Sequence, residues 1–169
     1  MPSEWLLREE LMREVERIVD QSKRAFEGEA WHGPSVMEIL DGITAPQAAA
    51  RPLSDAHSIW ELVFHIAAWE RAGLRRLGGD RANLSDAEDW PTVADTSEQA
   101  WELTRKTLKE GHDEFQDAVS KLDDSQLDQP IVGSRASVYG TLHGIIQHTL
   151  YHAGQIALLK KAITEGEKQ

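Results

Sequence analysis

The 169-residue sequence contains no cysteine, and this absence excludes several kinds of chemistry together. Without thiols the chain can form no disulfide, no thiolate metal site and no cysteine nucleophile. Any metal site must therefore use nitrogen and oxygen ligands. Any thiol that takes part in a reaction must come from another molecule.

The chain also lacks a long apolar run and an excess of positive charge. No apolar segment approaches the roughly 20 residues that cross a bilayer, and the N-terminal segment is charged throughout, unlike a secretory signal. The net charge of −11 would repel a phosphate backbone, and the basic clusters are short pairs such as Arg75 and Arg76. We therefore expect a cytoplasmic protein with a small-molecule substrate and with neither a membrane nor a nucleic-acid partner.

What remains is the composition of an ordinary globular protein, with 40% hydrophobic and 28% charged residues. The length suits one domain, so we expect a single domain over residues 1–169. Apolar residues recur at helical spacing in four segments, and no segment alternates long enough to predict a sheet. The sequence therefore predicts an all-α fold, an antiparallel-type four-helix bundle with short extra helices in the connections.

The four helices are predicted from their apolar stripes and their capping residues. The first spans about residues 3–26, the second begins near Ser58, the third begins near Ser97, and the fourth covers residues 142–161. Ser58 and Glu61 have the spacing of a capping box, and Gly78 and Gly79 end the second helix. The predicted stripes contain Leu7, Leu11, Val15, Ile18 and Phe26 in the first helix, and Trp101, Leu108, Phe115 and Leu122 in the third.

The connections carry weaker signals. SVMEILDGI predicts a short helix, TAPQAAARPLSDA a turn-rich link, and residues 129–132 a short extended piece. Residues 78–96 predict a loop that is long for a compact domain. Such a loop can be a mobile link or can cover a binding site, with Trp90 as the covering side chain or as an ordinary packing residue.

Three histidines form the candidate site. His148 and His152 are one turn apart on the fourth helix, beside the buried stripe of Leu142, Ile145, Ile156 and Leu159, so their rings can hold one ion. His65 lies at the edge of the apolar stripe of the second helix and supplies a third ligand. Three inward imidazoles from two helices leave an open position, as catalytic metal sites do. Each histidine taken alone could instead be a core residue with a hydrogen-bonded ring.

Other residues stay open as additions to this site. Glu61 lies one turn before His65 and could be a ligand, a hydrogen-bond acceptor for an imidazole or a general base. The plain alternative is that it caps the helix. His112 has the spacing of an inward residue on the third helix. His143 lies about 140° around the helix from His148, which predicts a surface position.

Two segments resemble the DinB superfamily of DinB/YfiT-like metalloenzymes: HSIWELVFHIAAWE in the second helix and YGTLHGIIQHTLYHAGQIALLKK in the fourth. The lead-in WHGPSVMEILDGITAPQAAARP is also similar, and the resemblance runs from about Leu6 to Ala162. It implies a four-helix bundle, often dimeric, in which His65, His148 and His152 hold a divalent ion such as nickel or zinc and water completes the shell. It also implies that a low-molecular-weight thiol can take part, since related members are thiol S-transferases or a thiol-dependent isomerase.

These observations favour a metal-dependent enzyme, either a hydrolase or a thiol-dependent S-transferase, with Glu61 as a candidate catalytic residue. The alternative is a noncatalytic bundle protein that binds a metal or a small ligand at the same place. The reaction, the substrate and the choice among metals that accept imidazole are not fixed by the sequence.

Overall fold

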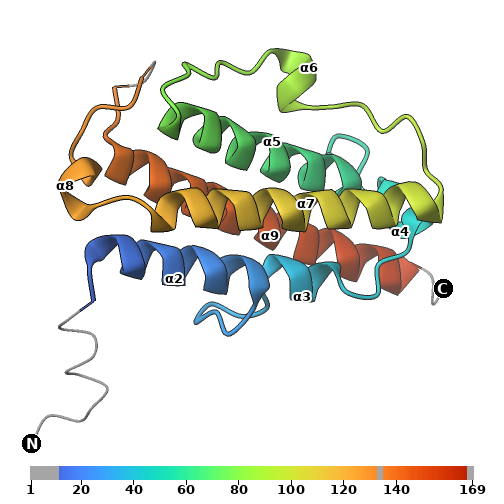
Figure 1. Cartoon of the computed structure of the whole chain (residues 1–169). Helices are drawn as coiled ribbons and strands as arrows, with labels where there is room; N and C mark the ends of the chain where they lie inside the picture. Colours follow the sequence, from blue (N-terminus) through green and yellow to red (C-terminus); the bar gives the residue numbers. More distant parts are fainter. Residues whose placement is uncertain (1–11, 133–134, 167–169) are drawn as a thin grey trace, which may run out of the picture.

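The computed structural model describes residues 12–132 and 135–166. Within these residues the regular structure is α-helical, apart from one isolated antiparallel bridge between Pro130 and Ser137 (Figure 1). The predicted all-α class is thereby confirmed, and the extended piece predicted at residues 129–132 is reduced to this bridge. None of the helices in the described part combines the length and the apolarity that crossing a membrane requires.

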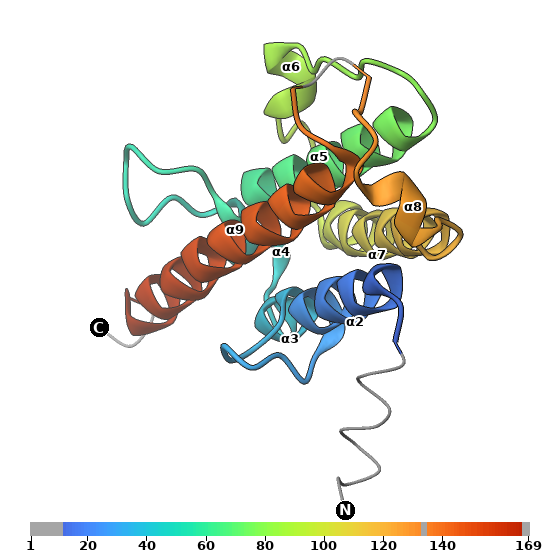
Figure 2. The same cartoon turned by 90° about the vertical axis from the view of Figure 1, so that its left-hand side faces the viewer.

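The longest helices of the described residues pack side by side around a shared core. They are α2 (Glu14–Glu27), α5 (Ile59–Leu77), α7 (Glu98–Ser120) and α9 (Val138–Gly166). Both α2 and α5 contact α7 and α9, so the helices form a closed ring, which Figure 2 shows obliquely from one end. Leu142, Ile145, Ile156 and Leu159 of α9 are all buried inside this ring, as their spacing predicts.

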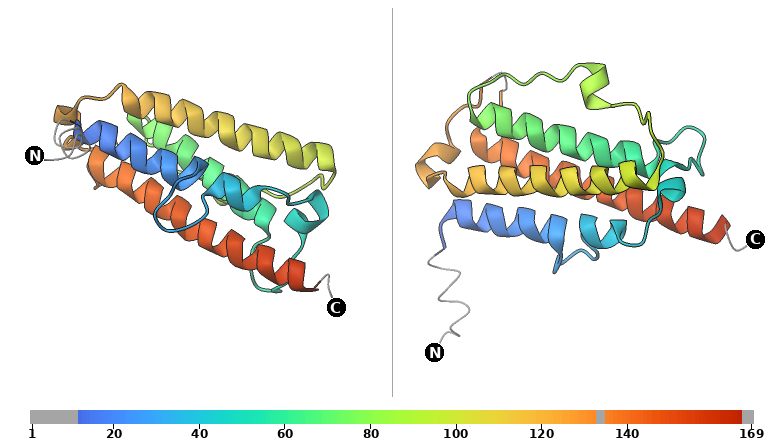
Figure 3. Two further views of the ribbon diagram at one scale, coloured as in Figure 1. Left: turned by 90° about the horizontal axis from the view of Figure 1, so that it is seen from below. Right: turned by 45° about the vertical axis from the view of Figure 1, so that its right-hand side comes forward.

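Short helices occupy the connections. α3 (Val36–Leu40) follows α2 and packs beside it against α9, as the view from below shows (Figure 3). α4 (Ala45–Ala49) lies in the segment predicted as a turn-rich link, α6 (Asp86–Asp89) lies in the predicted loop, and α8 (Asp124–Leu127) joins α7 to α9. The predicted short helices in the connections are thus present, although the sequence did not place α4, α6 and α8 individually, because single turns are too short to give a periodic signal.

The direction of α7 differs from the antiparallel order predicted for neighbouring helices. The segment between α5 and α7, which carries α6, returns along the length of the bundle, so α7 starts at the same end as α5 (Figure 1). α5 and α7 therefore run in the same direction and pack against each other. We call residues 78–97 the crossover segment.

The helix predicted over residues 3–26 is not continuous at Arg13. Arg13 has an extended backbone (φ −63°, ψ 153°), so α2 starts at Glu14, and the predicted stretch before Met12 lies outside the described residues. The physical reason is a cap from another part of the chain. The carboxylate of Asp124 accepts hydrogen bonds from the backbone N–H groups of Glu14 and Val15, at 2.9 and 3.0 Å. Leu7 and Leu11 lie outside the described residues.

The other helix boundaries follow the sequence more closely. Ser58 and Ser97 cap α5 and α7 through their side chains, as predicted. α7 ends at Ser120, so Leu122 lies just beyond the helix, although it still packs against the core. α9 begins at Val138, four residues before the predicted Leu142.

Candidate metal centre

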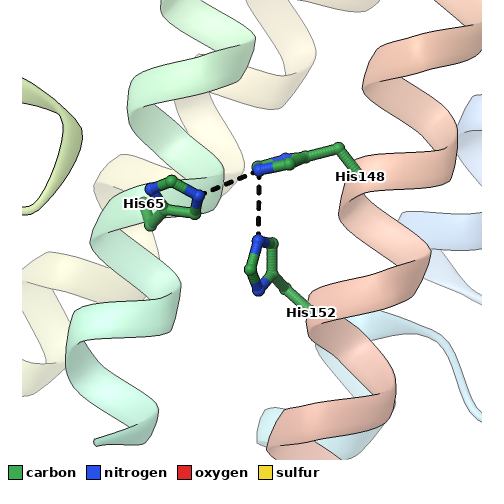
Figure 4. Close-up of side chains that lie close together, drawn as sticks. All are labelled: His65, His148 and His152. Carbon is green, nitrogen blue, oxygen red and sulfur yellow. Dashed lines mark hydrogen bonds between the residues drawn. The ribbon is translucent and has the colours of Figure 1, made fainter. Parts of the chain in front are cut away.

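The three predicted histidines meet between two packed helices. His65 projects from α5, His148 and His152 project from α9, and all three rings point into the space between these helices (Figure 4). The Nε2 atom of His148 lies 3.0 Å from Nε2 of His65 and 3.1 Å from Nε2 of His152. One candidate ligand atom from each residue lies within 4.8 Å of the other two. His65 and His148, which are 83 positions apart in the sequence, are therefore neighbours in the fold, as predicted.

These distances can be compared with those that a metal ion requires. Two nitrogen ligands about 2.1 Å from one ion lie about 3.0 Å apart at a right angle and about 3.4 Å apart in a tetrahedron. The two short Nε2 separations fall at the lower end of this range. Two ligands of one ion can be at most about 4.2 Å apart, and the bound of 4.8 Å on the separations within this cluster lies close to that limit.

The ring of His65 is held in one orientation from behind. Its Nδ1 lies 2.8 Å from the backbone carbonyl oxygen of Asp89, which can only accept, so Nδ1 carries the proton and donates. The Asp89 carboxylate is also 3.1 Å from this Nδ1 and accepts a hydrogen bond from Trp69 Nε1. A proton on Nδ1 leaves the lone pair on Nε2, which faces the centre. Such an acceptor behind a histidine is typical of metal ligands.

His152 is oriented in the same way by its own helix. Its Nδ1 donates to the side-chain oxygen of Gln155 at 2.7 Å, which again leaves a lone pair on Nε2. The Nε2 atoms of both His65 and His152 therefore present lone pairs toward Nε2 of His148. A single N–H on His148 can serve only one of them well, whereas a cation satisfies all three. The donor set thus fits a metal ion better than it fits a hydrogen-bond network.

Burial keeps the α9 imidazoles neutral. The pKa of His148 is lowered to about 4, first by burial and then by the neighbouring His152 and His65. Burial is also the main cause that lowers the pKa of His152, against a raising effect of Gln155. Nδ1 of His148 is buried and has no hydrogen-bond partner among the described residues. Neutral imidazole is the form that binds metal ions.

The crossover segment covers the centre with an aromatic side chain. Trp90 stacks on His65, with ring centroids 3.8 Å apart and planes 5° from parallel. It also stacks on His57, at 3.6 Å and 6°. Both roles considered for Trp90 are observed, since it lies against His65 beside Asp89 and also packs against the hydrophobic core.

A cavity of about 530 Å³ opens beside the three imidazoles, which is large enough for a small molecule. Its lining residues come from α5, α9 and the segment before α9: His65, Trp69, Arg76, Ala136, Thr141, Gly144, Ile145, His148, Tyr151 and His152. A second cavity, of about 620 Å³, lies between α5, α7 and the crossover segment, and the three histidines do not line it.

Glu61 takes the capping role that the sequence offered as one reading. Its carboxylate accepts hydrogen bonds from the backbone N–H and the hydroxyl of Ser58, at 2.8 and 2.9 Å, and from Arg51. Partial burial alone would raise the pKa of Glu61. The bonds from Ser58 and the charges of Arg51 and His57 outweigh this effect and lower the pKa below its usual value. A catalytic role for Glu61 stays a prediction.

The remaining candidates are placed away from the three imidazoles. His112 is fully buried, as its spacing predicts. Its Nδ1 lies 2.9 Å from Oε1 of Glu70, and its ring stacks on Phe26 with the ring centroids 3.7 Å apart. His143 is only half-buried and packs against Tyr139, with the ring centroids 4.3 Å apart. Neither belongs to the group of side chains that could share an ion.

Sequence reasoning missed the residues that hold the ligands. Asp89 contacts His65 through its backbone carbonyl. Because every residue type has a backbone carbonyl, no sequence motif predicts this contact. Trp69, one turn after His65, could have been found as a second aromatic residue on the same face, and its indole N–H fixes the Asp89 carboxylate at 2.7 Å.

Comparison with known protein families matches residues 30–156 to the model described as the DinB superfamily. This match includes all of α5, residues 138–156 of α9 and all three histidines. No curated protein matches the chain significantly.

Proposed function

The chain belongs to the DinB superfamily, and from its convergent imidazoles we propose that it is a metal-dependent enzyme. In this proposal His65, His148 and His152 bind one divalent ion, nickel or zinc. The observation that carries it is the meeting of their three Nε2 atoms, with the Nδ1 protons of His65 and His152 held away by Asp89 and Gln155. Family membership and the histidine cluster are both compatible with a metal-binding helical protein.

In the proposed reaction the protein binds the ion, orients its imidazole ligands and limits the access of water. When bound, the ion supplies Lewis acidity, which lowers the pKa of a coordinated water molecule or thiol toward neutrality. Three neutral imidazoles leave the positive charge of the ion undiminished and leave positions open for other ligands. Trp90 and the helix walls limit the access of water to one side, and the adjoining cavity gives the substrate its place.

We propose two reaction classes for such a site, hydrolysis and thiol-dependent S-transfer. A hydrolase would use water as the nucleophile. A transferase would use a low-molecular-weight thiol, which must come from solution because the chain has no cysteine. The cavity beside the histidines is wide enough to hold either a substrate or such a thiol.

Metal analysis of the purified protein is the first test. We expect about one equivalent of nickel or zinc per wild-type chain, and its loss in the double variant His148→Ala, His152→Ala. His143→Ala is the matched control, since it removes an imidazole from the same helix outside the cluster and should retain the metal. Wild-type protein that takes up no divalent ion, even after incubation with nickel or zinc salts, would refute the proposal.

A noncatalytic protein that binds a metal or a small ligand is the rival function, and activity separates the two. The metal-loaded protein should be tested with thiols and electrophiles and with simple esters and amides. An enzyme shows turnover that His152→Ala abolishes. Stoichiometric metal without turnover on any of these substrates favours the binding protein.

A further inference from the structure

One cation shares the cavity of the three histidines. Arg76, three turns beyond His65 on α5, lines the same cavity and is half-buried. Its guanidinium lies 5.4 Å from the centroid of the Trp69 ring. It also donates weak hydrogen bonds to the carbonyl oxygens of Arg81 and Ala82, at 3.5 and 3.3 Å. The head group is therefore positioned from two sides, by an aromatic face and by the backbone of the crossover segment.

The charge of Arg76 is not neutralised within the described part of the chain. Its partners there are carbonyl oxygens and an indole, and no carboxylate pairs with it. Its neighbour Arg75, by contrast, forms an ion pair with Asp80 at 2.7 Å. Arg75 is exposed to solvent, whereas Arg76 is half-buried. A half-buried charge without a partner is costly, and a bound anion would offset that cost.

Trp69 sets the spacing between this cation and the histidines. The Arg76 guanidinium lies over the indole, and the same indole lies 5.6 Å from the ring of His148. The lining of the same cavity includes Gly144 and Ile145, which offer no charge. A ligand that reaches both ends therefore needs an anionic group at one end, a short apolar stretch, and a metal-binding group at the other end.

We propose that Arg76 recognises a carboxylate on the substrate or thiol of this site. The inference rests on the proposed metal function and adds the chemical class of its ligand, a small monocarboxylate whose reactive end reaches the ion. A carboxylate is favoured over a phosphate because one guanidinium matches a single negative charge through two parallel hydrogen bonds. A phosphate dianion would leave a second charge unpaired against apolar walls.

The test uses cobalt-substituted full-length protein, in which the charge-transfer absorption of a bound thiolate reports binding without turnover. The probes are 3-mercaptopropionate, which carries a carboxylate, and 1-propanethiol, which is neutral and similar in length. Wild type should bind the carboxylate thiol about 10-fold or more tightly than the neutral thiol. Arg76→Gln should remove this preference and leave the affinity for 1-propanethiol unchanged. 2-Mercaptoethyl phosphate, tested in the same way, should bind less tightly than 3-mercaptopropionate.

Two variants make the interpretation sharp. Arg75→Gln is the matched control, because Arg75 is the adjacent cation and is paired with Asp80. This variant should keep the full preference for the carboxylate thiol. Arg76→Lys keeps the positive charge but cannot form two parallel hydrogen bonds to a carboxylate. It should therefore retain part of the preference for 3-mercaptopropionate. Equal affinity of wild type for the two thiols overturns the proposal, as does an Arg76→Gln variant that weakens both alike, which shows a structural role. These results are separate from failure of the metal function, which appears earlier as wild-type protein that takes up no cobalt.

Discussion

For two of the three imidazoles, those of His65 and His152, the orientation of the ring is fixed by the partner of the nitrogen that faces away from the centre. Asp89 fixes His65 through a carbonyl oxygen, and Gln155 fixes His152 through a side-chain oxygen. Histidine has two tautomers, and only the one with the proton on Nδ1 offers the Nε2 lone pair to an ion. The partners therefore matter to metal affinity although they do not touch the ion.

Replacing Gln155 by Leu tests this dependence. The change keeps the size of the side chain but removes the acceptor for the Nδ1–H of His152. We expect zinc affinity to fall by about 10-fold or more, measured by competition with a chromogenic chelator. Gln147→Leu, at an exposed position of the same helix, should match wild type. If both variants bind zinc as wild type does, Gln155 does not orient the ligand.

The histidines of the site could be predicted from the sequence, whereas the residues that surround them could not. His148 and His152 could be predicted because a four-residue spacing places two side chains on one helix face, and His65 because it borders an apolar stripe. Asp89 and Arg76 could not be predicted as neighbours of that site. Their positions depend on the path of the crossover segment and on how far an arginine side chain folds back along α5.

Among the helices, the start of α2 shows how one element can be defined by another. Asp124, at the start of α8, caps α2 across 110 positions of sequence. Local patterns identified the caps of α5 and α7, because Ser58 and Ser97 bond within their own helices. They could not identify a cap from a distant residue, and they extended the first helix through Arg13 for that reason. The direction of α7 was missed similarly, since periodicity carries no information on the path of a connection.

Asp124→Ala should destabilise the protein in a pH-dependent way. The backbone N–H groups of Val15 and Glu14 bond the ionised carboxylate and lower the pKa of Asp124 below its usual 3.8. This contribution is fully present above the usual value and disappears as the pH falls through the lowered one. We therefore expect a melting temperature a few degrees below wild type at pH 7.

The difference between Asp124→Ala and wild type should shrink toward zero when thermal unfolding is followed by circular dichroism at pH values below about 3.8. Asp117→Ala, at an exposed ion pair on α7, serves as the control and should change the melting temperature much less. A constant difference across this pH range would mean that the ionised cap is not the source of the effect.

At the scale of the whole molecule, the all-α class followed directly from the four apolar stripes. Within the described residues each of the four long helices contributes buried side chains to one hydrophobic cluster, as Phe26, Ile66, Leu108 and Ile156 show. The expectation of a single domain over residues 1–169 stays a prediction. So does association of the chain, for which the surface of α9 gives a concrete starting point.

We predict a homodimer in solution, as the family resemblance implies. Tyr151 and Leu158 lie seven residues apart on one face of α9 and are 66% and 62% exposed, which makes this face a candidate interface. Sedimentation equilibrium should give about twice the chain mass of 18.9 kDa, and Leu158→Lys should shift the protein toward the monomer. Leu103→Lys, on α7 and equally exposed, should not. A wild-type mass of one chain contradicts the prediction.

The junction of His65 with His148 joins points 83 positions apart in the chain. An ion held there would act as a reversible cross-link, closing a loop longer than either helix and restricting the unfolded chain far more than a local contact does. Removal of the ion by a chelator would then remove this cross-link between α5 and α9. Metal supply would in that way govern how long the folded protein survives, as well as what it can react with.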